Sequence, residues 1–79
     1  MWYLYLIRCG DGTIYTGISP DPEKRLKKHT SGRGAKYTST RLPLELIFVM
    51  PVGTRSEATK LELKVKRLSH QQKIAMSLQ

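Results

Sequence analysis

The segment Trp2–Ser19, with the sequence WYLYLIRCGDGTIYTGIS, decides the fold because it contains two tyrosine-bearing triplets separated by a turn. Residues 2–7 are aromatic or aliphatic throughout, and residues 14–19 mix apolar with small side chains, as strands commonly do. The intervening Gly10-Asp11-Gly12 contains an Asp-Gly pair, which is typical of a tight turn between strands. The segment is therefore predicted to form a β-hairpin.

The length of the hairpin loop decides whether the tyrosines can act together. A two-residue loop would leave Tyr5 and Tyr15 on opposite faces of the sheet, because side chains alternate between faces. A three-residue loop of residues 10–12, with Gly12 in a left-handed bulge, would put Gly17 opposite Tyr5 and both tyrosines on one face. We expect the three-residue loop. The absence of a side chain at Gly17 would then leave space over the Tyr5 ring.

The charge of the chain indicates a polyanionic partner. The 79 residues carry 14 Lys and Arg against 6 Asp and Glu, which gives a formal net charge of +8 at pH 7. A field of this size favours nucleic acid first and an acidic membrane surface second. The length fits one domain, residues 1–79, with a single thin core.

Several classes of protein are excluded by composition. The single cysteine, Cys9, excludes an internal disulfide and a cysteine-rich zinc site, and we expect it to be a small buried residue. No apolar run approaches the roughly 20 residues of a membrane span. Residues 1–8 lack the basic start and the cleavage site of a signal peptide. A cytoplasmic protein that makes no use of a membrane is therefore expected.

A short helix is predicted after the hairpin, from Glu23 to about Thr30. Asp21 suits the N-cap, and Pro22 suits the first helical position, where its missing N–H costs nothing. Gly32 should end the helix. The turn of chain after the second strand is thus short, so the helix should lie close to the hairpin.

Two polar side chains share one face of this helix. Arg25 and His29 are four residues apart, whereas Lys24, Lys27 and Lys28 point elsewhere. If the shared face is directed at the tyrosines, its side chains could hold a phosphate and move a proton. The alternative is a solvated basic helix without a specific role.

The next segment, residues 31–36, is glycine-rich and basic, so it could offer backbone N–H groups and cations to a phosphate or simply connect two elements. We take Arg33 and Lys36, together with Lys28 of the preceding helix, as candidate nucleic-acid contacts. Tyr37 could stack on a base or pack over the sheet.

A third strand is predicted over residues 44–50, closed by Pro43 and Pro51. Strict alternation would place its apolar side chains on two faces, and helices should therefore cover both sides of the sheet. One face would carry Leu44, Leu46, Phe48 and Met50, and the other Ile47 and Val49.

A long helix is predicted to begin at Thr54, because Thr54 and Glu57 form a capping box. Glu62 lies roughly 80° from the centre of the buried stripe at about 100° per residue, so its carboxylate should reach the edge of the sheet-facing surface. An ordinary ion pair with neighbouring lysines is the alternative. The stripe consists of Ala58, Leu61, Val65 and Leu68.

The last helix is predicted from a second capping box at Ser69 and Gln72. Leu63 lies outside the stripe of the long helix, and we expect the last helix or a partner to cover it. The order of elements is β-β-α-β-α-α. It predicts an α+β fold with a small three-stranded antiparallel sheet flanked by helices.

These features resemble the GIY-YIG nuclease superfamily over nearly the whole chain, and most of all its short stand-alone bacterial members. The first triplet departs from the family name, because Tyr3 stands in place of glycine and Leu4 in place of isoleucine, and the second triplet has Thr16 in its middle. The resemblance implies the GIY-YIG endonuclease fold. It also implies a metal-dependent nuclease that hydrolyses phosphodiester bonds in DNA, as in repair or recombination-type processing.

The resemblance also implies the roles of individual residues. Arg25 would clamp the scissile phosphate, and Glu62 would hold a single divalent ion, Mg²⁺ or Mn²⁺. The general base is left open: a neighbouring cation could lower the pKa of Tyr5 enough for catalysis, or His29 could accept the proton. The implied catalytic set is Tyr5, Tyr15, Arg25, His29 and Glu62.

Other functions remain compatible with the sequence. The altered first triplet would suit a non-catalytic nucleic-acid-binding module that retains the fold, and the charge alone would suit a small RNA- or ribosome-associated protein. DNA is the expected partner, with RNA as the alternative. A protein partner could supply substrate specificity.

Overall fold

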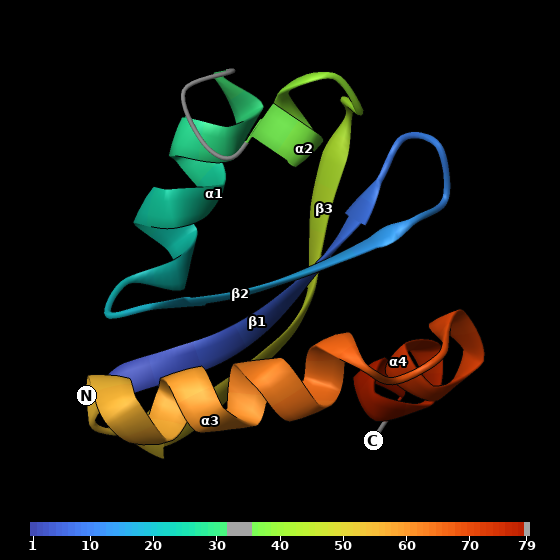
Figure 1. Ribbon diagram of the computed structural model, residues 1–79. Helices are drawn as coiled ribbons and strands as arrows, with labels where there is room; N and C mark the ends of the chain where they lie inside the picture. Colours follow the sequence, from blue (N-terminus) through green and yellow to red (C-terminus); the bar gives the residue numbers. More distant parts are fainter. Residues whose placement is uncertain (32–35, 79) are drawn as a thin grey trace.

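The computed structural model describes residues 1–31 and 36–78 of the chain. In this part of the chain, the three strands and three helices expected from the sequence follow one another in the predicted order, and a fourth helix, of four residues, lies between the first helix and the third strand (Figure 1). The elements are β1 (Trp2–Cys9), β2 (Ile14–Ser19), α1 (Pro22–Thr30), α2 (Lys36–Ser39), β3 (Leu44–Gly53), α3 (Arg55–Lys66) and α4 (His70–Ser77).

The sheet is antiparallel with the strand order β2-β1-β3, so β1 is the central strand. The expected hairpin register is confirmed, because Tyr5 pairs with Gly17 and Ile7 with Tyr15. Gly12 has a φ of +86°, the left-handed conformation that a three-residue loop requires. Tyr5 and Tyr15 therefore lie on the same face of the sheet.

The third strand differs from the prediction at two points. Strict alternation is wrong because β1 residues Leu6 and Ile7 pair with Phe48 and Leu46, which leaves Ile47 as the extra residue of a bulge. The bulge moves Phe48 to the face opposite Leu46.

Pro51 was expected to end the strand, but it lies within β3 and pairs with Tyr3. An edge strand tolerates proline because its outward side has no ladder hydrogen bond to lose.

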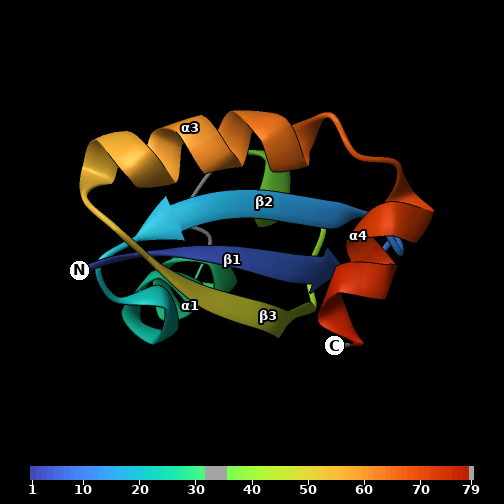
Figure 2. The same cartoon turned by 90° about the horizontal axis from the view of Figure 1, so that it is seen from below.

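Helices cover both faces of the sheet, as predicted (Figures 1 and 2). On one face α3 and α4 pack over a cluster built on Leu4, Leu6, Ile14 and Val65. On the other face α1 packs over Tyr5, Ile7 and Cys9 through Leu26. Successive residues of β1 thus serve different layers, which places the tyrosines under α1 and the main apolar core under α3.

The predicted starts of three helices are confirmed, whereas Gly32, expected to end the first of them, lies outside the described residues. Asp21 caps α1 by accepting the backbone N–H of Lys24, with Pro22 in the first turn, and both capping boxes, at Thr54 and at Ser69, are present. Leu63 stays 55% exposed, so α4 does not cover it. Instead α4 packs on the core, and the Nε2–H of His70 donates a hydrogen bond to the Gly12 carbonyl oxygen, which links α4 to the hairpin loop.

Among the residues described, the helices are all too short or too polar to span a membrane.

Candidate active site

Tyr5 is the centre of the candidate site. It lies in the middle of β1 with only 1% of its surface exposed, and its ring passes over Gly17 of the neighbouring strand. A Cβ atom built at Gly17 would overlap the hydroxyl oxygen of Tyr5. Any side chain at position 17 would therefore displace the phenol, which explains the glycine without reference to backbone conformation.

The Gly17→Ala variant is expected to lose about 1–3 kcal/mol in free energy of unfolding, the usual cost of overpacking a core. Urea denaturation followed by circular dichroism measures this loss. Gly12→Asn is the control, since Gly12 has open space around its Cβ position and asparagine tolerates positive φ. An unfolding free energy of Gly17→Ala equal to that of the unmodified protein would show that Tyr5 is not fixed over Gly17.

Three rings form a cluster on the α1 face of the sheet. The ring centroids of Tyr5 and Tyr15 are 6.4 Å apart, and His29 lies 6.2 Å from the first and 5.3 Å from the second. The tyrosines come from adjacent strands and the histidine from α1. The predicted convergence of this helix face on the tyrosines is therefore present.

A chain of buried hydrogen bonds runs through His29. Its Nε2 atom lies 3.1 Å from the Tyr5 hydroxyl oxygen, and its Nδ1 atom lies 2.7 Å from Oγ1 of Thr38 in α2. His29 and Thr38 have no exposed surface. A neutral imidazole donates from one nitrogen and accepts at the other, so a tautomer that donates from Nδ1 to Thr38 accepts from the Tyr5 hydroxyl at Nε2. Within the described residues, this hydrogen bond connects the buried His29 to Tyr5.

The surroundings of His29 and Tyr5 keep both side chains uncharged near neutral pH. Burial lowers the pKa of His29, and the Arg25 guanidinium lowers it further. Burial, assisted by the neighbouring Tyr15, raises the pKa of Tyr5 to about 12, although Arg25 opposes the shift. Arg25 thus lowers the pKa of Tyr5, as expected of a neighbouring cation, but desolvation of the phenolate outweighs this effect.

Stability should fall as the solution is acidified through the range of this histidine. The folded-state pKa of His29 is lowered, so below the unfolded value of 6.5 the unfolded chain binds a proton that the folded chain excludes. The free energy of unfolding is therefore highest above pH 6.5, and it decreases as the pH falls from 6.5 toward the folded-state pKa of His29. Urea denaturation at pH 7.5, 6.5 and 5.5 should show this loss.

His29→Gln should flatten the pH dependence, and His70→Gln, which alters the chain's other histidine, should retain it. A pH dependence that is the same in His29→Gln as in the unmodified protein would contradict the buried, neutral imidazole.

Arg25 and Glu62 approach the rings from two different helices. Arg25 is half-buried on α1, and its charge acts on the pKa of Tyr5, Tyr15 and His29. The Glu62 side chain on α3 is only 17% exposed, and its carboxylate raises the pKa of both tyrosines. Glu62 is therefore close enough to the ring cluster to act on it electrostatically, and it also makes the alternative ion pair with Lys66, at 3.8 Å.

The donor set at Glu62 suits a loosely held divalent ion. Within residues 1–31 and 36–78 there is no group of three or more His, Cys, Asp or Glu side chains that could enclose a metal. Mg²⁺ is commonly held by one or two carboxylates, with waters and substrate phosphates completing its octahedron. A single inward-facing carboxylate beside phenols fits this pattern and does not fit a closed structural site.

The expected nucleic-acid contacts have different surroundings. Lys28 lines a groove together with Arg25, and Lys36 is exposed at the start of α2. The Tyr37 ring packs against Tyr15 at 5.9 Å between centroids, and the Arg41 guanidinium lies 3.9 Å from its centre. One face of Tyr37 is therefore already covered by the protein. Arg33 lies outside the described residues.

Sequence reasoning missed two residues of this cluster. Thr38, the partner of His29, belongs to a four-residue helix with no sequence signal beyond its position after a basic loop. Arg41 covers Tyr37 and pairs with Asp11 of the hairpin loop at 3.0 Å. The pairing joins segments thirty residues apart, and a local pattern cannot indicate such a contact.

The fold and this cluster define a nuclease-type catalytic domain. A family model described as the GIY-YIG catalytic domain matches residues 1–75, and the chain belongs to that family. Nucleic acid is the substrate class that the family implies.

Two relatives are similar to this protein in sequence over most of the chain. A UPF0213 protein of Cupriavidus pinatubonensis is 50% identical over 94% of this chain and 82% of its own length. UPF0213 protein YhbQ of Escherichia coli is 49% identical over 91% of this chain and 72% of its own length.

Two NMR structures share the fold. That of a UPF0213 protein from Bacillus halodurans has a TM-score of 0.57 and 42% identity, covering 95% of this chain and 81% of that one. That of a protein from E. faecalis has a TM-score of 0.60 and 47% identity, covering 90% and 76%.

Proposed function

We propose that the protein is a metal-dependent nuclease that hydrolyses phosphodiester bonds in DNA. The observation that carries the proposal is the buried chain from the Tyr5 hydroxyl through His29 to Thr38, placed between Arg25 on one helix and Glu62 on another. A domain that only bound nucleic acid would need cations at its surface. It would not need a carboxylate turned toward phenols or a neutral histidine beneath them.

His29 is the proton acceptor in this proposal, and Tyr5 connects it to the attacking water. The phenol gives its proton to Nε2 of His29 as its oxygen takes a proton from the water, so the phenolate never accumulates despite a pKa of about 12. The Oγ1 atom of Thr38 accepts a hydrogen bond from Nδ1–H of His29 and so keeps the imidazole in the required tautomer. Tyr15 positions the water or a phosphate oxygen with its hydroxyl.

Arg25, together with a metal ion held by Glu62, would offset the negative charge of the substrate phosphate. Arg25 binds the scissile phosphate, where its planar fork matches two phosphoryl oxygens. Glu62 would hold Mg²⁺ or Mn²⁺, which when bound supplies a further positive charge to the phosphoryl oxygens. Lys28, Lys36, Arg33 and Tyr37 remain predicted contacts to the rest of the substrate.

The biological setting is also part of this proposal. We take residues 1–79 as a single nuclease domain in the cytoplasm that acts in DNA repair or recombination-type processing, with a protein partner that supplies specificity. RNA is the alternative substrate. A nucleic-acid-binding module without turnover is the alternative function, which the substitutions of glycine by Tyr3 and of isoleucine by Leu4 favour.

Cleavage of labelled branched, nicked and single-stranded DNA, and of single-stranded RNA, tests the proposal. The purified protein is incubated with each substrate in Mg²⁺, in Mn²⁺ and in EDTA, and Glu62→Gln, purified in parallel, gives the background. Cleavage that needs the metal and exceeds this background supports the proposal. Binding of every substrate without cleavage in either metal would establish the non-catalytic module instead.

A further inference from the structure

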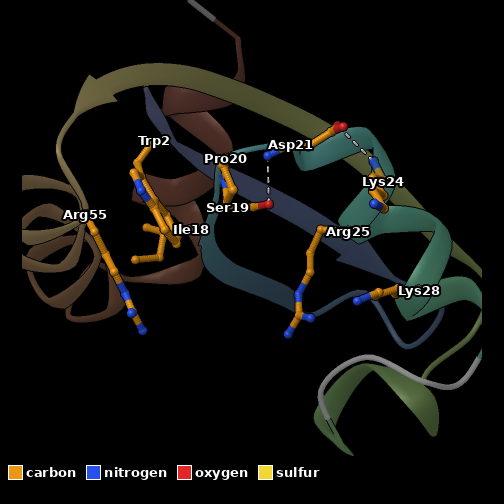
Figure 3. A pocket seen from close by; sticks show the side chains of 9 residues that line it. All are labelled: Trp2, Ile18, Ser19, Pro20, Asp21, Lys24, Arg25, Lys28 and Arg55. Atoms are coloured by element: carbon orange, nitrogen blue, oxygen red, sulfur yellow. Dashed lines mark hydrogen bonds between the residues drawn. The ribbon is translucent and has the colours of Figure 1, made fainter.

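A basic groove of about 500 Å³ extends from Arg25 away from the ring cluster. Its floor is the end of β2, its walls are the start of β1 and the first turns of α1, and the first residue of α3 closes it (Figure 3). A volume of this size is typical of pockets that hold small ligands, so the groove has room for part of one strand. It is lined by Trp2, Ile18, Ser19, Pro20, Asp21, Lys24, Arg25, Lys28 and Arg55.

The cations of the groove are not neutralised by the protein. In the described part of the chain, the ion pairs are Arg8 with Glu45, Arg41 with Asp11 and Lys66 with Glu62, and none involves a groove residue. The one groove carboxylate, Asp21, accepts the backbone N–H of Lys24 as the cap of α1. Four basic side chains, Lys24, Arg25, Lys28 and Arg55, are thus available to phosphates.

The wall opposite α1 is aromatic. Trp2 is half-buried in the groove, and the Arg55 guanidinium lies 5.4 Å from its ring centre, within the range of a cation–π contact. Figure 3 shows Trp2 and Arg55 on one side, and Arg25 and Lys28 on the other, with Ser19 and Pro20 between them. A planar aromatic group and a cation held side by side match the base and the phosphate of one nucleotide.

We propose that this groove binds an unpaired nucleotide next to the scissile phosphate, with its base stacked on Trp2 and its phosphate held by Arg55. The proposal rests on the nuclease function, because Arg25 belongs both to the groove and to the candidate active site. A base must leave its pair to stack on an indole, so the groove selects single-stranded extensions, flaps or ends over intact duplex. The groove would thus add a preference for an unpaired base, which the ring cluster by itself does not determine.

Binding in EDTA tests the groove without cleavage. Trp2 is the only tryptophan of the chain, so fluorescence excited beyond the absorption band of the four tyrosines reports on the groove. Titration with an oligothymidylate should quench this fluorescence, and an abasic deoxyribose-phosphate strand of equal length and charge should bind more weakly and leave the emission largely unchanged. Equal affinity and equal quenching by the two strands would overturn the proposal, because the groove would then recognise charge only.

Variants separate stacking from charge. Trp2→Leu keeps an apolar side chain but removes the fluorophore, so its binding is measured by the anisotropy of a dye-labelled oligothymidylate. It should weaken binding by roughly 5- to 150-fold, the range expected for loss of one stacked base. Arg55→Gln should reduce the slope of log affinity against log salt by about 0.7, and Lys64→Gln, an exposed change elsewhere on α3, should leave it unchanged. Unaltered affinity in a folded Trp2→Leu would also contradict the groove.

The outcomes for the groove and for the nuclease function are distinguishable. Base-dependent quenching in a protein that cleaves nothing would retain the nucleotide site and reject the nuclease. Metal-dependent cleavage without base-dependent quenching would reject the site alone.

Discussion

Glu62→Gln is expected to reduce the rate of DNA cleavage in Mg²⁺ by about 10³- to 10⁴-fold, which corresponds to roughly 4–6 kcal/mol of transition-state stabilisation. Glutamine fills the same space on α3 but carries no charge, so it is a poor ligand for a hard cation. Single-turnover cleavage of an end-labelled oligonucleotide measures the loss, because it separates the chemical step from product release.

Two controls make this result specific. Glu23→Gln removes an exposed carboxylate from the first turn of α1 and should cleave at the normal rate. The Glu62–Lys66 pair is half-exposed on its lysine side, so its loss should change the free energy of unfolding by less than about 1 kcal/mol. Cleavage by Glu62→Gln at the rate of the unmodified protein would place the metal, or the nuclease itself, elsewhere.

Tyr5→Phe is expected to lower the cleavage rate by about 10²- to 10⁴-fold, the usual contribution of a positioned acid–base group. Phenylalanine keeps the ring over Gly17 but removes the oxygen that joins the water to His29. The neighbouring change Tyr3→Phe, on the same strand, is the matched control and should have little effect. A folded Tyr5→Phe with normal activity would eliminate Tyr5 from the reaction.

A double-mutant cycle then shows whether Tyr5 and His29 act as one unit. If the proton passes through both, His29→Gln should cost much less in the Tyr5→Phe background than in the unmodified protein. The rate should also decrease at acidic pH as His29 becomes charged below its ordinary pKa of 6.5, with no rise near pH 10, since the pKa of Tyr5 is about 12. Additive losses would show that His29 acts without Tyr5.

The sequence predicts those parts of the fold that depend on neighbouring residues. The loop at residues 10–12 determines the register that brings Tyr5 beside Tyr15, and the side-chain caps at Asp21, Thr54 and Ser69 determine where helices begin. These signals are local, because a turn or a cap involves only a few consecutive residues. The four-residue spacing of Arg25 and His29 is local in the same sense.

The remaining features depend on contacts between distant segments. The bulge at Ile47 arises from the pairing of β3 with β1, and an alternating pattern of apolar residues does not reveal it. The pKa of Tyr5 depends on how deeply α1 and the sheet bury the phenol, and this burial outweighs the nearby cation that the sequence does predict. Trp2 and Arg55 are likewise 53 positions apart in the numbering and meet only after folding.

The alternation of β1 has an evolutionary consequence. Leu4 and Leu6 hold the α3 layer together, whereas Tyr5 lies among the groups proposed for chemistry. Neighbouring positions of β1 are therefore under different selection. Leu4 and Leu6 are selected for stability of the fold, and the hydroxyl of Tyr5 for the proposed activity. Loss of the Tyr5 hydroxyl alone could abolish the proposed hydrolysis in a descendant whose apolar layers on both faces of the sheet stayed intact.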